Sequence, residues 1–121
     1  MKRLTTAMLI CASMLFLTVL KDVAHADEDR QCGKASWYQL TTRTASGEYA
    51  DPEKMTAAHR KLKFGHVIEV ENMRNGKKVI VRVNDRGPFI KGRILDVSRI
   101  AAQKLGFIRA GTTKVCFRIL K

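Results

Sequence analysis

The stretch His66–Asn84, HVIEVENMRNGKKVIVRVN, contains the strongest structural signal in the chain. On both sides of the pair Asn75-Gly76, apolar residues alternate with polar ones, as expected of half-buried strands. Asparagine and glycine both tolerate a positive φ, so this pair predicts the turn between the strands. The stretch therefore predicts an antiparallel hairpin. Its second strand presents three valines on one face: Val79, Val81 and Val83.

Outward from this hairpin, most of the chain also has the character of short strands. Further strands are expected at Lys34–Leu40, Ile94–Val97 and Lys114–Leu120. A helix is predicted after Ser98, which can cap its first turn, and Gly106 is expected to end it. A second, weaker helical turn is expected within Pro52–His59. Short strands with one or two short helices indicate an all-β domain, a small closed barrel.

The N-terminal segment has the layout of a secretory signal peptide. A basic start, Lys2-Arg3, precedes the apolar run Ala7–Leu20, and Ala24–Ala26 supplies a small-x-small cleavage pattern. We expect a signal peptide over residues 1–26 and one domain over residues 27–121. A membrane anchor is the alternative, but a spanning helix needs about 20 apolar residues. Lipid attachment at Cys11 is a third possibility, although the preceding residue is not small.

Charge and export together restrict the expected partners. The chain carries a formal net charge of +12, and residues 1–26 hold three basic residues and one acidic, so +10 remains after cleavage. Such a protein is attracted to anionic polymers such as peptidoglycan, teichoic acid, lipopolysaccharide or anionic lipid. Because the chain lacks interleaved aromatic and basic residues and is expected outside the cytoplasm, we expect no nucleic-acid partner.

Two cysteines, Cys32 and Cys116, remain once Cys11 is removed with the signal peptide. In an oxidising compartment such a pair predicts a disulfide, here between the first and the last strand. The alternative is a reactive catalytic thiol, which no nearby His–Asn arrangement supports. Of the histidines only His59 and His66 remain, and their spacing predicts no metal site. We expect no cofactor.

Several polar and aromatic residues could carry chemistry. Asp85 follows a strand and precedes the rigid Gly87-Pro88 turn, so it could face a groove; the alternative is a hydrogen bond to the turn backbone. Glu48 lies in a loop and His59 in a small apolar stretch. Each of them has an ordinary structural alternative, a surface carboxylate and a packed histidine. Trp37 and Tyr38 could stack on sugar rings or pack in the core.

Three segments carry a recognisable combination of motifs: Gly33–Tyr38, then Gly47-Glu48 followed by Met55–His59, and finally Val81–Phe89 with the sequence VRVNDRGPF. Together they resemble one known family, the RlpA (rare lipoprotein A) family. Arg93–Ser98 and Ala101–Gly106 match the same pattern. The resemblance extends from Gly33 to Leu120, nearly all of the expected mature chain.

The resemblance implies a six-stranded double-psi β-barrel and a lytic transglycosylase that cuts between N-acetylmuramic acid and N-acetylglucosamine. Asp85 is then the expected catalytic acid and Glu48 a second functional carboxylate, with His59 in the same groove. Arg86 joins Trp37 and Tyr38 as a candidate for substrate binding. If Arg86 paired with Asp85, however, the acid would be weakened.

The expected activity has two alternatives. One is a non-catalytic wall-binding or wall-loosening barrel of the expansin type, and the other is a secreted effector or inhibitor that uses the barrel to bind proteins. The loop Gln39–Arg43 is shorter than the family pattern, which affects the fit of a substrate. We expect a monomer that binds peptidoglycan strands in the periplasm or outside the cell, without stable membrane insertion after cleavage.

Overall fold

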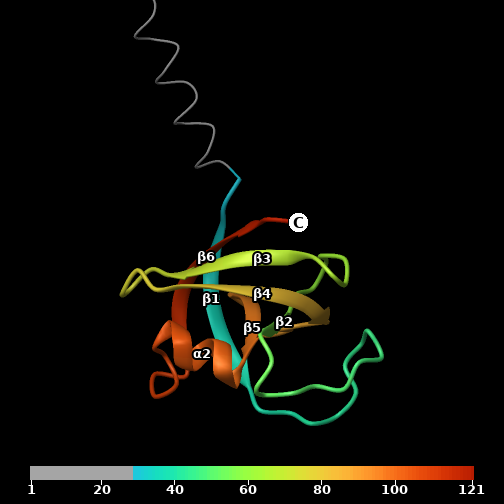
Figure 1. Cartoon of the computed structure of the whole chain (residues 1–121). Helices are drawn as coiled ribbons and strands as arrows, with labels where there is room; N and C mark the ends of the chain where they lie inside the picture. Colours follow the sequence, from blue (N-terminus) through green and yellow to red (C-terminus); the bar gives the residue numbers. More distant parts are fainter. Residues whose placement is uncertain (1–28) are drawn as a thin grey trace, which may run out of the picture. The chain divides into compact units, whose positions relative to one another are not determined.

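The computed structural model describes residues 29–121, so the expected signal peptide over residues 1–26 lies outside the described residues. Within these residues, six strands close into a barrel in the order β1-β5-β2-β4-β3-β6, with one helix, α2, beside it (Figure 1). The bounds are β1 Gln31–Tyr38, β2 Thr56–Ala58, β3 Val67–Asn72, β4 Lys78–Asp85, β5 Arg93–Ser98, α2 Arg99–Leu105 and β6 Thr112–Ile119. The predicted all-β class and closed barrel are confirmed.

The hairpin that dominates the sequence is formed by β3 and β4 in antiparallel register, with Ile68 opposite Val81. Its turn differs from the expectation, because Gly76 alone has a positive φ, 76°. The backbone N–H of Gly76 donates to the carbonyl of Asn72 at 2.8 Å. Asn75 contributes through its side chain, which donates to the carbonyl of Leu105 at 2.9 Å. The turn is therefore attached to the end of the helix.

A buried asparagine, Asn72, connects three parts of the barrel. Its side-chain amide donates to the carbonyl of Leu105 at 2.9 Å, and its Oδ1 accepts hydrogen bonds from the Thr113 hydroxyl at 2.8 Å and the Arg74 backbone at 3.0 Å. All polar groups of this side chain lie out of water, and each finds a partner. Asn72 thus holds the hairpin, the end of α2 and β6 together.

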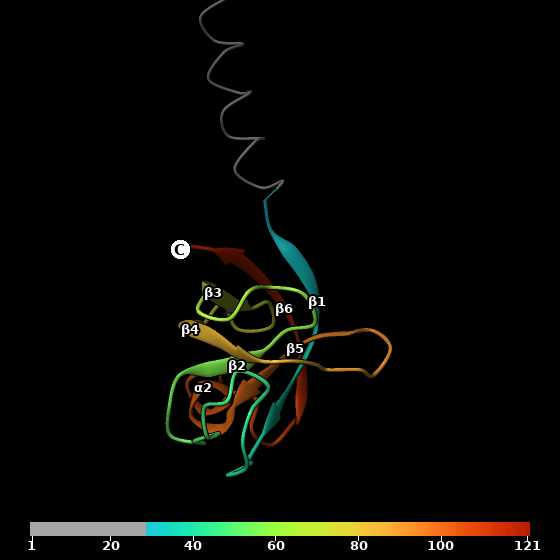
Figure 2. The same ribbon diagram turned by 90° about the vertical axis from the view of Figure 1, so that its right-hand side faces the viewer.

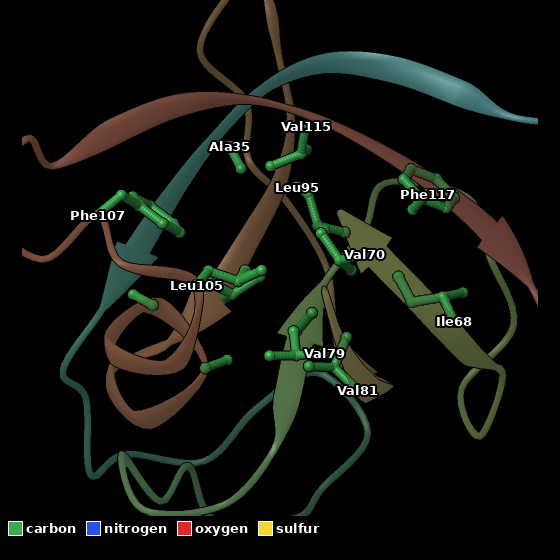
Figure 3. Close-up of a cluster of buried hydrophobic side chains, with 14 of the residues drawn as sticks. Ala35, Ile68, Val70, Val79, Val81, Leu95, Leu105, Phe107, Val115 and Phe117 are labelled. Carbon is green, nitrogen blue, oxygen red and sulfur yellow. The ribbon is translucent and has the colours of Figure 1, made fainter. Parts of the chain in front are cut away.

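The core fills the inside of the barrel and the space under the helix (Figure 3). Strand alternation directs the valines of β4 inward, as predicted, and α2 adds Ala101, Ala102 and Leu105. Ser98 caps the helix by accepting from the Ala101 backbone, and Gly106 ends it at φ 80°. The largest fully buried side chains are Phe107, Phe117, Ile68, Leu95 and Leu105. No helix within residues 29–121 is long and apolar enough to cross a bilayer.

The second helical turn expected within Pro52–His59 is not present, and that prediction was wrong. The segment turns and then enters β2, which pairs with β4 in parallel and with β5 in antiparallel orientation. All three residues of β2 are buried. Because β2 supplies the hydrogen bonds that two neighbouring strands would otherwise lack, tertiary pairing overrides the local helical pattern.

The predicted disulfide joins Cys32 of β1 to Cys116 of β6. The two residues are direct partners in the antiparallel register, and 84 positions of sequence separate them. The bond therefore links the first strand to the last, as expected.

Replacing both Cys32 and Cys116 by serine should destabilise the barrel strongly. Opening so long a loop restores conformational entropy to the unfolded chain, about 4–5 kcal/mol in the chain-entropy model. Urea unfolding followed by circular dichroism measures the loss, and reduced wild-type protein should unfold at the same urea concentration as the variant. An unchanged midpoint in the double variant would contradict this role.

Candidate active site

A cleft of about 280 Å³ opens where β4 ends and β5 begins. Figure 2 shows the connection between these strands, residues 86–92, projecting from the barrel. Polar and apolar residues share the lining, and two aspartates are among them. The lining residues are Ser36, Tyr38, Leu40, Ala58, Asp85, Arg86, Gly87, Pro88, Phe89, Ile90, Arg93 and Asp96.

Strand pairing explains why these residues meet. Asp85 of β4 is the register partner of Ala58 of β2, and Ala58 is the partner of Asp96 of β5. On its other side, Asp96 is paired with Ser36 of β1. Register partners project on the same face of a sheet. Four neighbouring strands therefore place a row of four side chains along the cleft, with the small Ala58 between the two acids.

A register shift aims Asp85 into the cleft. Ala57 pairs with Val83, but Ala58 pairs with Asp85, so Asn84 has no partner of its own on β2. Strict alternation would have placed Asp85 on the same face as Val83, which is buried in the core. Irregularities of this kind re-aim a side chain at the end of a strand. The shift therefore gives the acid its access to solvent.

In the part of the chain that the structure describes, the carboxyl group of Asp85 is held by backbone donors and by no cationic side chain. Its Oδ1 accepts the N–H groups of Arg86 at 2.8 Å and Ala45 at 2.9 Å. Among residues 29–121 it forms no ion pair. The Arg86 guanidinium instead donates to the carbonyls of Leu62 at 2.7 Å and His59 at 3.2 Å. The ion pair that would have weakened the acid does not form.

Glu48 lies beside the cleft in a polar cluster. Both of its oxygens accept from Arg82 Nη2 at 2.9 Å, and Oε1 also accepts from the amide of Asn84 at 2.8 Å. The hydrogen bonds from Arg82, and then that from Asn84, hold the pKa of Glu48 below its ordinary value. Glu48 is therefore ionised at neutral pH, and it does not line the cleft itself.

A tight turn carries Glu48 to this place. Gly47 has φ 89°, and its N–H donates to the carbonyl of Thr44 at 3.0 Å. Two contacts attach the turn to the end of β4: Ser46 donates its N–H to the Asn84 carbonyl, and Ala45 donates to Asp85. The loop thus brings both carboxylates predicted from the sequence to the same end of the barrel.

His59 lies behind the cleft. Its Nδ1 accepts the backbone N–H groups of Lys61 and Leu62, each at 3.0 Å, and its ring meets Phe117 edge-on at 5.5 Å. Burial lowers the pKa of His59, and the nearby positive charges of Arg60, Arg86 and Lys61 lower it further. The ring is therefore neutral near pH 7, and its backbone N–H donates to the Asp85 carbonyl at 3.1 Å.

The two aromatic residues that were candidates for stacking on sugars or for core packing lie in different places. Tyr38 lines the cleft, but it is only 8% exposed and its hydroxyl is hydrogen-bonded to Thr56. Trp37 does not line the cleft, since it packs against the core and donates to the carbonyl of Ile108. The exposed aromatic ring at the cleft is Phe89, which is 79% accessible.

Asp96 is the main residue of the cleft that sequence reasoning missed. Ser36 Oγ donates to its Oδ1 at 3.1 Å. Burial raises the pKa of Asp96 and the charge of Asp85 adds to this, against the Ser36 hydrogen bond and the charge of Arg93. The available signal was an acid within the short apolar strand Ile94–Val97. Among residues 29–121, no cluster of His, Cys, Asp or Glu is suited to hold a metal ion.

Comparison with known sequences identifies the family. The profile of the family described as Lytic transglycolase matches residues 30–117. The "Endolytic peptidoglycan transglycosylase RlpA" of Neisseria meningitidis serogroup A is 52% identical over 91 residues, which are 73% of this chain and 38% of that protein. The chain therefore spans less than half the length of this curated relative.

Solved structures agree on the fold. The Streptomyces papain inhibitor matches with a TM-score of 0.65 and 21% identity, over 76% of this chain and 94% of that one. An expansin of Clavibacter michiganensis matches with a TM-score of 0.61 and 24% identity, over 76% of this chain and 50% of that one. Together with the family profile, these findings show that the chain belongs to the RlpA-like Lytic transglycolase family of double-psi β-barrels.

Proposed function

We propose that this protein is an endolytic peptidoglycan transglycosylase, which cuts between N-acetylmuramic acid and N-acetylglucosamine and leaves a 1,6-anhydromuramyl end. The observation that carries the proposal is the Asp85 carboxyl group, which lines an open cleft and, within residues 29–121, is not engaged by a cationic side chain. The relative from Neisseria meningitidis, named for this activity, supports it.

The main requirement of this reaction is well-placed carboxyl groups. An acid must protonate the leaving oxygen, and a base must take the proton of the muramyl 6-hydroxyl as it attacks C1. No water is consumed, so the site needs no room for a hydrolytic water of the kind that inverting glycosidases hold. Asp85 is the carboxyl group that we assign to this proton transfer.

Glu48 has a different role in this proposal. Its contacts with Arg82 and Asn84 keep it ionised, so it cannot donate a proton. A fixed negative charge beside the cleft instead stabilises the positive charge that develops at C1 in the transition state. His59, which is neutral and turned toward the core, supports the strand end that carries Asp85.

Export and wall binding complete the proposal. The predicted signal peptide sends the protein to the periplasm or the cell exterior, where it acts as a monomer on glycan strands. Lys34 of β1 pairs in register with Arg93 of β5 and with Lys114 of β6, so three cations lie side by side. Neighbouring like charges repel one another. An anionic wall polymer would relieve that repulsion.

A wall-binding barrel without catalysis is the second candidate, because the expansin of Clavibacter michiganensis has the same fold. The cleft, the exposed Phe89 ring and the three neighbouring cations would serve either candidate. The two candidates differ only in whether the glycan is cut.

Asp85→Asn should reduce the release of 1,6-anhydromuramyl fragments from purified sacculi by at least about 100-fold, because the amide cannot transfer the proton. Mass spectrometry of the soluble fragments measures this. Asp29→Asn, an exposed acid outside the strands, is the matched control and should behave as wild type. Wild-type protein that sediments with sacculi but releases no such fragments would establish the non-catalytic candidate instead.

Glu48→Gln should lower fragment release by about 100- to 1,000-fold, the range found when one stabilising group of a transition state is removed. The side chain keeps its size and can still accept from Asn84, so sedimentation with sacculi should be unchanged. Glu69→Gln is the control, since it also breaks an arginine pair, the exposed contact with Arg118. Equal activity of the two variants would argue against an electrostatic role for Glu48.

Lys34→Gln with Lys114→Gln should weaken sedimentation with sacculi severalfold at low salt. The difference should vanish near 1 M NaCl, where the Debye length is only about 3 Å. Lys78→Gln with Lys104→Gln removes the same charge from another exposed face and should have a smaller effect. Equal losses in both double variants would show that net charge attracts the wall, and not the neighbouring cations of β1, β5 and β6.

A further inference from the structure

Asp96 occupies an unusual position for a charged residue. Its neighbours in β5, Leu95 and Val97, are fully buried in the core, and Asp96 points to the opposite face. There it lies between two small side chains, Ser36 of β1 and Ala58 of β2. Small neighbours leave space above the carboxyl group, which is why Asp96 lines the cleft.

The carboxyl group of Asp96 is partly buried and is not paired with a cation of the described residues. Among residues 29–121 it forms no ion pair, and its one side-chain partner is the Ser36 hydroxyl. A carboxylate withdrawn from water costs free energy unless a charge partner or several hydrogen bonds compensate. The neutral acid avoids much of this cost, because a protonated carboxyl group needs less solvation.

We propose that Asp96 donates the proton to the glycosidic oxygen, and that Asp85, across Ala58, receives the proton of the 6-hydroxyl. This inference rests on the proposed transglycosylase activity and refines it, since it divides between two carboxyl groups the work that one could perform alone.

The register sets the spacing of the pair. Asp85 and Asp96 are partners of the same residue on β2, so their Cα atoms are two interstrand distances apart, about 9–10 Å before the curvature of the barrel is counted. Both side chains line one cleft, so their carboxyl groups can approach a bound sugar from two sides. Ala58 between them has only a methyl group and leaves the gap open.

The reaction needs no reactant besides the glycan and the two carboxyl groups. The proton on Asp96 moves to the glycosidic oxygen while the C1–O bond breaks and its electron pair stays on that oxygen. The 6-hydroxyl oxygen then forms a bond to C1, and its proton moves to the Asp85 carboxylate. Asp96 ends ionised and Asp85 protonated, and proton exchange through the cleft restores the starting state.

The electrostatic surroundings favour this division. Burial and the charge of Asp85 raise the pKa of Asp96, and the Ser36 hydrogen bond and the charge of Arg93 oppose that rise. The other ionisable groups that line the cleft are Arg86, whose guanidinium is engaged by backbone carbonyls, and Tyr38, whose pKa burial raises. Activity should therefore fall at high pH as Asp96 loses its proton.

The test compares pH profiles of fragment release from sacculi for wild type, Asp96→Asn, Asp85→Asn and the control Asp29→Asn. Asp96→Asn should lose at least about 100-fold at the optimum. Its thermal melting and sedimentation with sacculi should stay like those of wild type, since the amide can keep the Ser36 hydrogen bond. Asp96→Asn with activity within a few-fold of wild type would overturn the inference and leave the proposed function standing.

Ser36→Ala provides a second readout that does not depend on how well Asp96→Asn folds. The Ser36 hydrogen bond lowers the pKa of Asp96, so its removal should move the high-pH limb of the profile to higher pH. The low-pH limb should not move. A high-pH limb that stays in place would show that Asp96 is only structural. If wild type releases no fragments, the proposed function fails, and this inference fails with it.

Discussion

The structure depends on the pairing of one very short strand. β2, Thr56–Ala58, lies between β4 and β5, parallel to the first and antiparallel to the second, and its hydrogen bonds close the barrel. The register shift after Ala57 sets how β4 ends. Because of that shift Asp85 leaves the core face and lines the cleft, while Ala58 separates it from Asp96. A slip of one residue would exchange the faces of every side chain involved.

The second feature of the site is the separation of its charges. The two arginines that flank Asp85 in sequence are both engaged elsewhere, Arg82 by Glu48 and Arg86 by backbone carbonyls and the Phe64 ring. The guanidinium of each arginine thereby fixes a neighbouring loop and does not contact the Asp85 carboxyl group. This arrangement lets a strongly basic protein keep accessible acids in one cleft.

Local patterns in the sequence predicted much of this architecture. The alternation around Asn75-Gly76, the caps of the helix and the cysteine pair each depend on neighbouring residues or on counting, and each prediction was confirmed. β2 was missed because three residues contain no periodicity, and their strand conformation comes from partners that are distant in the sequence. The register shift, which decides where Asp85 points, likewise has no local signature.

The predicted site differs from the observed one because strand pairing decides where side chains point. The family motifs predicted Asp85 and Glu48 as functional residues, and both lie at the same end of the barrel. The position of Asp96 in the cleft follows from the strand order, which places it beside Ala58, and the sequence motifs do not indicate it. Trp37 was a candidate either for stacking on a sugar or for packing in the core. Alternation along β1 turns it toward Ile108, while Phe89 is the exposed ring of the cleft.

The most direct test of this account is a crystal structure of the Asp85→Asn variant with a bound, uncut peptidoglycan glycan oligomer. The account predicts that the scissile glycosidic oxygen lies about 3 Å from the Asp96 carboxyl group, within reach for proton transfer. The muramyl 6-hydroxyl should then face residue 85, with the sugar above Ala58. A glycan bound on another face of the barrel, or one whose scissile bond lies far from both residues, would contradict it.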